Sequence, residues 1–170
     1  MASLMEELLS TLEEEKNGYT DLYNLSEPKR DAIVHNKVED LEKITSMEEV
    51  FHVTLKNLEK KRLRTLKDMA VVMGHDGEDI TVTSLAELLS NQPKEREALL
   101  KARDELVEAA SKMRFMNEQN RILLEQALEM VDFDLTLFKS MRRAPETANY
   151  GKNGENTGDI LGGGGFDAKQ

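Results

Sequence analysis

The sequence has 170 residues and a formal net charge of −10, with 33% charged and 5% aromatic residues. This length suffices for one domain with a hydrophobic core, and the negative charge argues against nucleic-acid or anionic-membrane partners because it would repel them. The chain has no Cys, which excludes disulfides and thiolate chemistry and fits a reducing cytosol.

The amino-terminal residues do not have the pattern of a targeting segment. Glu6 and Glu7 stand where a signal peptide would be apolar, and no basic segment leads into an apolar run. The longest apolar run, Met69 to Met73, is too short to cross a bilayer. We therefore expect a cytoplasmic protein without membrane insertion.

Apolar residues at helical spacing predict a first helix over Ala2 to Leu25. Asn17-Gly18 interrupts this segment, but the apolar phase continues through it, so we expect a weak point and no turn. Ser26-Glu27-Pro28 combines an N-cap residue with a Pro in the first turn, which predicts a restart and a short helix to about His35.

The next segment, Lys37 to Met73, contains no Gly or Pro and keeps the helical phase, which predicts a second long helix that Gly74 ends. A loop at 75–79 follows, and then a short helix capped by Thr81 or Thr83 and running through Leu89. Strict apolar alternation is absent, so no strand is predicted.

Residues Lys94 to Met141 again contain no Gly or Pro, and they follow Pro93. Their apolar stripe predicts a third long helix. The sequence therefore predicts an all-α protein: an elongated antiparallel bundle of three long helices, with short helices in the connections. We expect a bundle domain over 1–141 and a tail over 142–170. The stripe consists of Leu99, Leu106, Ala110, Met113, Leu124, Ala127, Val131 and Phe138.

The tail holds seven of the ten glycines and few large apolar residues. Ordering it would cost roughly 1 kcal/mol per residue in backbone entropy, more than its apolar side chains could return on burial. We expect it to be disordered in the free protein. Tyr150 and Phe166 lie in small apolar islands, which fit either docking points or an inert tail.

No residues suggest catalysis, a metal or a cofactor. His35, His52 and His75 lie in separate segments without a second ligand at metal-site spacing. The loop at 75–79 lacks the oxygen ligands of a calcium site, and the run Gly162 to Gly165 has neither the strand nor the Lys of a phosphate loop. We expect no enzymatic activity, no cofactor and no small-molecule substrate.

Polar residues interrupt the apolar faces of all three long helices. The apolar phases bring Glu15, Glu48, Arg62, Asn117 and Asn120 into these faces. Such residues cost stability unless they are paired, and they fix register and partner choice in helical bundles. They can form one satisfied polar layer or lie at the solvent-exposed edge of a narrow bundle, or some of them can mark where the apolar face opens to receive a foreign helix.

Four sequence segments, in this order, resemble flagellar export chaperones of the FlgN type. They are the pattern L-x-x-x-L-L-x-x-L-x-x-E-x-x-x-Y over Leu4 to Tyr19, the segment Lys29 to Asn36, the short helix Thr83 to Leu89, and Asn117-x-x-Asn120-x-x-Leu123-Leu124-x-x-x-Leu128. The tail, with Tyr-Gly-x-x-Gly and a closing Phe-Asp, is similar to that of Gram-positive or clostridial members.

The resemblance implies a non-enzymatic cytosolic chaperone. Such a protein would bind the carboxy-terminal helices of the hook-associated proteins FlgK and FlgL, which form the hook–filament junction. It would prevent premature assembly and deliver them to the export gate, an FlhA-type cytoplasmic domain. Helix-in-groove recognition would suit this task. A competing reading is a structural coiled-coil or scaffold protein that self-associates through its long helices.

The resemblance also implies that the carboxy-terminal third carries the client-binding residues. The apolar positions of the last helix can equally be intramolecular core. The predicted client-binding residues are Leu123, Leu124, Ala127, Leu128, Val131, Leu135, Phe138 and, in the tail, Tyr150.

Overall fold

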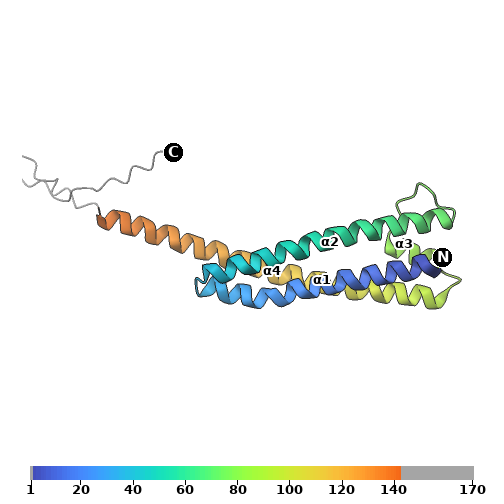
Figure 1. Ribbon diagram of the computed structural model, residues 1–170, viewed down its shortest axis with the longest axis horizontal. Helices are drawn as coiled ribbons and strands as arrows, with labels where there is room; N and C mark the ends of the chain where they lie inside the picture. Colours follow the sequence, from blue (N-terminus) through green and yellow to red (C-terminus); the bar gives the residue numbers. More distant parts are fainter. Residues whose placement is uncertain (1, 143–170) are drawn as a thin grey trace, which may run out of the picture. The chain divides into compact units, whose positions relative to one another are not determined.

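The computed structural model describes residues 2–142, and every regular element among them is a helix (Figure 1). The all-α prediction is therefore confirmed for this part of the chain. Residues 143–170, on which the predicted tail and Tyr150 fall, lie outside the described residues. The helices are α1 (Ala2–Val34), α2 (Val38–Val72), α3 (Val82–Leu88) and α4 (Pro93–Arg142).

Helices α1 and α2 form an antiparallel hairpin. Glu15 of α1 pairs with Arg62 of α2, whereas Lys29, further along α1, pairs with the earlier Glu48. Between these pairs the helices approach closely, since a Cβ added at Gly18 would lie 2.8 Å from Leu55 Cδ2. The expected continuation of the helix through Asn17-Gly18 is confirmed, and Gly18 makes room for a buried leucine.

The predicted restart at Ser26 is wrong, because α1 continues through Pro28 to Val34. Proline at position 28 removes one helical hydrogen bond, to the carbonyl of Asn24. Asn24 is exposed, so water can replace that bond, while Leu22, Ala32 and Ile33 are buried on both sides of the proline. Burial of the same face before and after Pro28 thus outweighs the local breaking signal.

The connections use the residues that the sequence indicated. Gly74 adopts φ +82°, which a residue with a Cβ rarely does, and it ends α2. Thr81 caps α3 in a capping box: its hydroxyl accepts from the Ser84 N–H at 3.1 Å, and the Ser84 hydroxyl accepts from the Thr81 N–H at 2.8 Å. Pro93 is the first residue of α4, where a missing N–H costs nothing.

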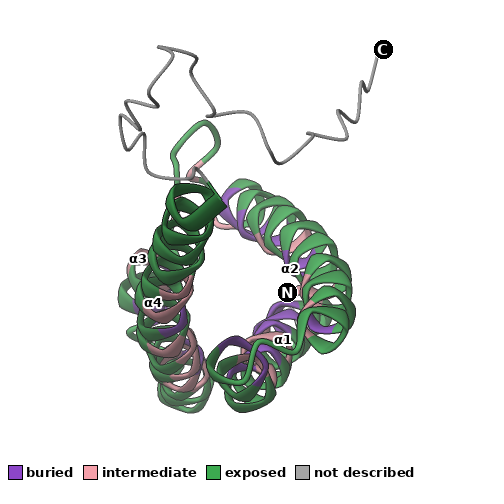
Figure 2. Ribbon diagram, turned by 90° about the vertical axis from the view of Figure 1, so that its left-hand side faces the viewer, coloured by how far each residue is buried: buried purple, intermediate pink, exposed green. Residues whose placement is uncertain are grey.

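A buried hydrophobic cluster joins the start of α1, the end of α2, α3 and α4 as far as Leu106. Figure 1 shows the amino terminus beside α3 at this end. Its buried members are Met5, Leu8, Leu12, Leu66, Met69, Leu85, Ala86, Leu89, Leu99 and Leu106. In Figure 2 the buried positions lie along the inner sides of α1 and α2.

Within the first unit, helix α4 runs parallel to α1. Lys16 pairs with Glu105 at 3.1 Å, and further along both helices the amide of Asn120 bonds to the carbonyl of Ser26. Leu99 and Leu106 of α4 also share a buried cluster with Leu8 and Leu12 of α1, so apolar packing and two polar contacts join these helices.

The contacts between Cα atoms divide the chain into two units, and the division falls within α4, between Ala127 and Leu128. The first unit contains α1, α2, α3 and α4 as far as Ala127. In the second unit, the described residues are the last turns of α4, from Leu128 to Arg142. The domain boundary expected after Met141 stays a prediction.

Candidate functional site

The last turns of α4 are helical for local reasons. Residues 128–142 contain neither Gly nor Pro, and Lys139 and Arg142 lie in the last turn, where positive charge complements the negative end of the helix dipole. The guanidinium carbon of Arg142 also lies 5.0 Å from the centre of the Phe138 ring, a cation–π distance. Arg142 thus covers part of one aromatic side chain.

This segment exposes an unusual amount of apolar surface. Every residue from Leu128 to Arg142 is exposed, and eight of these residues are large and hydrophobic. Scattered apolar side chains are normal on a protein surface, whereas a contiguous group marks an interaction site. The second unit therefore contains the strongest candidate for a binding surface.

Four of the predicted client-binding residues form one side of this segment, which we name the first strip: Leu128, Val131, Leu135 and Phe138. Their spacing of three, four and three residues places them on one face of the helix. These residues are 48–57% exposed, so this face of the helix is not buried in a core formed by the described residues. The first strip is available to a partner.

The other predicted residues have different surroundings. Leu123, Leu124 and Ala127 belong to the first unit and are half-buried, which leaves them less accessible than the first strip. Tyr150 lies outside the described residues.

Sequence reasoning missed a second apolar face, which we name the second strip: Met130, Phe133, Leu137 and Met141. Their side chains are 48–75% exposed. A search for one continuous stripe rejects these residues, because their helical phase differs from that of the first strip by roughly 130° at 3.6 residues per turn. The density of apolar residues after Ala127, on more than one face, was the signal that could have revealed them.

Two of the predicted polar residues form a partly buried ion pair between α1 and α2. Glu15 is buried, and its Oε2 accepts from Nη1 of Arg62 at 3.1 Å. Burial raises the pKa of Glu15 above its usual value, although the positive charge of Arg62 counteracts part of this effect. This pair is an interior contact of the hairpin.

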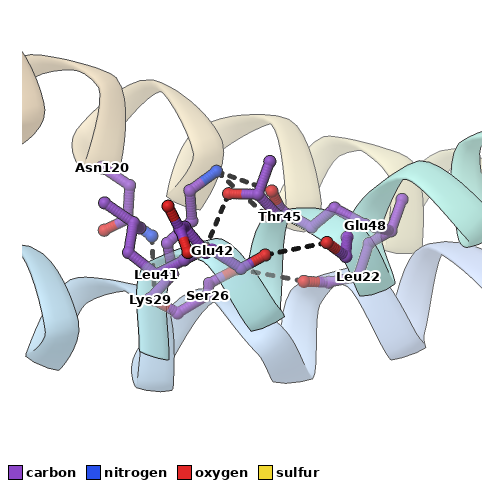
Figure 3. Close-up of polar contacts among 9 residues, drawn as sticks. Leu22, Ser26, Lys29, Leu41, Glu42, Thr45, Glu48 and Asn120 are labelled. Atoms are coloured by element: carbon purple, nitrogen blue, oxygen red, sulfur yellow. Dashed lines mark hydrogen bonds and ion pairs between the residues drawn. The ribbon is translucent and has the colours of Figure 1, made fainter. Parts of the chain in front are cut away.

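Glu48 makes a similar contact near the other end of the hairpin. Its two carboxylate oxygens accept from Nζ of Lys29 at 3.0 and 2.8 Å (Figure 3). Both side chains are largely buried, so the pair is better protected from solvent than an ordinary surface ion pair. Glu48 and Lys29 thus join α2 to α1.

Asn120 connects α4 to α1. Its Nδ2 donates to the Ser26 carbonyl at 2.8 Å, and its side chain is 2% exposed (Figure 3). The Oδ1 atom of Asn120 is buried with no hydrogen-bond partner. Asn117 is exposed instead, so the structure does not place it with the buried polar residues. Of the two asparagines, only Asn120 lies between helices.

Neither a metal-ligand cluster nor a membrane-spanning helix is found in residues 2–142. No group of three or more His, Cys, Asp or Glu side chains in this range could hold a metal ion. Among the described helices, none combines the length and the apolar character that crossing a bilayer requires.

Comparison with family models shows that residues 1–158 match the family described as FlgN protein. Comparisons with curated proteins and with solved structures gave no match. The family is one of chaperones and not of enzymes. Because the match covers nearly the whole sequence, the chain belongs to the FlgN family of chaperones for flagellum assembly.

Proposed function

We propose that this protein is a cytoplasmic flagellar export chaperone that binds the carboxy-terminal helices of the hook-associated proteins FlgK and FlgL. It prevents their premature assembly and delivers them to the FlhA-type cytoplasmic domain of the export gate. The proposal includes an antiparallel arrangement of the three long helices, with the glycine-rich residues from 142 onward as an extension.

The observation that carries the proposal is the exposure of the first strip. Leu128, Val131, Leu135 and Phe138 have the spacing with which one helix packs on another, and they are open to solvent. A junction protein awaiting export presents an amphipathic helix that needs such a face. Helix-in-groove recognition would cover both apolar surfaces at once.

The test places charges on the first strip. Val131→Asp combined with Leu135→Asp should abolish binding of purified FlgK and FlgL, measured by isothermal titration calorimetry. Both residues are about half exposed, so the helical content by circular dichroism should stay near that of the parent protein.

A matched control adds the same two charges elsewhere on the same turns. Thr136 and Ser140 are exposed and lie on the polar side of α4, so Thr136→Asp with Ser140→Asp should leave client binding intact. Failure of the parent protein to bind either client would refute the proposal. A salt-insensitive obligate oligomer by light scattering, with no client binding, would favour the scaffold reading.

A further inference from the structure

The second strip has no role in the function proposed above. A single amphipathic helix on the first strip would leave Met130, Phe133, Leu137 and Met141 in water. A helix that is apolar on more than one side is normally buried on more than one side. The segment from Leu128 to Arg142 therefore has the surface of a central helix, with neighbours on two faces.

Polar residues separate the two strips and so define two distinct faces. Around the helix axis, Asp134 lies in the shorter arc between the two strips. The longer arc holds Glu129, Asp132, Thr136 and Lys139. The roughly 130° between the strip centres is too wide for one helix to cover both, and it suits two helices side by side.

Helices are the partners that fit, because the first strip has the helical phase of the α4 residues that already contact other helices in this protein. In the first unit, Leu99, Leu106 and Asn120 are the buried residues of α4, and Asn120 bonds directly to α1. By spacing along the sequence, the first strip continues this phase.

The charges along the segment also define the partner. Glu129, Asp132 and Asp134 lie in its first half, and Lys139 and Arg142 lie at its end. A matching helix carries basic residues toward the first half and acidic residues toward the end.

A second copy of this chain fits the first strip poorly. Antiparallel self-pairing, with Leu128 opposite Phe138, would bring Asp132 level with Asp134 of the other copy. Parallel self-pairing of either strip would bring every acidic residue level with its own copy. Like charges across a helix pair are destabilising.

We propose that residues 128–142 bind two amphipathic helices of one client chain at the same time, one on each strip. This inference rests on the proposed function and specifies its client as a helix pair. When one client helix has bound, the second is held nearby at a high effective concentration, so two modest contacts give one stable complex.

The experiment removes one strip at a time from the full-length protein. Val131→Ser with Leu135→Ser weakens the first strip, and Phe133→Ser with Leu137→Ser weakens the second. Thr136→Ala with Ser140→Ala is the control. Each variant is titrated with full-length FlgK, with full-length FlgL, and with a synthetic peptide of the last amphipathic helix of FlgK.

Each strip variant should weaken binding of at least one full-length client by about tenfold or more, whereas the control should change it less than about twofold. The peptide should respond to one strip variant only. The inference is overturned if second-strip substitutions leave both full-length affinities unchanged. If, in that case, first-strip substitutions weaken binding, the proposed function stands although the inference about the second strip is wrong.

Sedimentation velocity of the client-free protein tests the alternative that a second copy of this chain occupies the second strip. A monomer in the parent protein and in both strip variants supports the inference. A dimer that the second-strip substitutions dissociate would assign that strip to a second copy of this chain and would overturn the inference.

Discussion

At the scale of single residues, the Glu15 carboxyl is a buried acid with a raised pKa. The Glu15 carboxyl therefore binds a proton more tightly in the folded protein than in the unfolded chain. Protonation of Glu15 therefore adds to the free energy of unfolding. This addition is complete below the ordinary pKa of 4.5, and it is lost as the pH rises through the raised pKa of the folded protein.

Glu15→Gln removes this titration and keeps an oxygen that can accept from Arg62. We expect the free energy of unfolding of the parent protein to fall relative to that of Glu15→Gln between pH 4.5 and pH 7. Urea unfolding at both pH values measures the difference. A difference that does not change with pH would contradict the burial of a titrating carboxyl.

Asn120 gives a second prediction at this scale. Asn120→Asp replaces the donor to the Ser26 carbonyl by a carboxylate, so an acceptor would face an acceptor in a buried place. We expect a loss of about 2–3 kcal/mol in the free energy of unfolding at pH 7.

The loss should shrink in acid, because a protonated Asp can again donate to the carbonyl. Asn117→Asp is the control: the same change at an exposed position of the same helix should cost less than about 0.5 kcal/mol. Equal losses in the two variants would show that Asn120 has no special place between the helices.

At the scale of elements, Pro28 lies within α1 with its ring on the exposed side. Pro28→Ala restores a helical N–H without removing a buried side chain. We expect stabilisation of about 1–3 kcal/mol, seen as a higher midpoint of thermal unfolding.

Pro93→Ala is the matched change at the first position of α4, where proline is already favourable. It should bring no stabilisation. If Pro28→Ala likewise brings none, then the proline costs α1 less than an interior position normally would.

The sequence predicts most of the elements because long runs without Gly or Pro keep one helical phase. It predicts α2, α3 and α4 to within one or two residues of their bounds. It fails at Ser26-Glu27-Pro28, because a local rule cannot take account of the burial of Leu22, Ala32 and Ile33 in the folded protein. Tertiary packing decided that position.

The candidate site was predictable only in part, for a related reason. One helical phase leads to Leu128, Val131, Leu135 and Phe138, but an apolar face in the sequence gives no information about whether the protein itself covers it. Exposure distinguishes these residues from Leu99 and Leu106, which have the same character and are buried. The second strip, too, could be identified as a free surface only from the exposed fractions of its side chains in the structure.

At the scale of the whole molecule, burial is unevenly distributed along the chain. The cluster that contains Leu8, Leu85 and Leu99 consists of buried residues, whereas every residue of 128–142 is exposed. Amides that open without exposing a core exchange quickly with solvent.

We expect hydrogen exchange at 128–142 to be at least about 100-fold faster than around Leu8 and Leu99 in the free protein. Saturating FlgK should slow exchange at 128–142 and leave the cluster unchanged. The comparison within one sample is its own control. Protection at 128–142 equal to that of the cluster before any client is added would contradict the exposure of both strips.

The hydrogen bond from Asn120 to Ser26 has a consequence for anyone who redesigns this protein. If α4 slid along α1 by one helical turn, about 5.4 Å, the asparagine would leave its carbonyl and face an apolar or charged side chain instead. Leucine side chains alone would tolerate such a slide far better. Replacing Asn120 by leucine to gain thermal stability would therefore remove a buried polar contact that distinguishes the native alignment of these two helices from its neighbours.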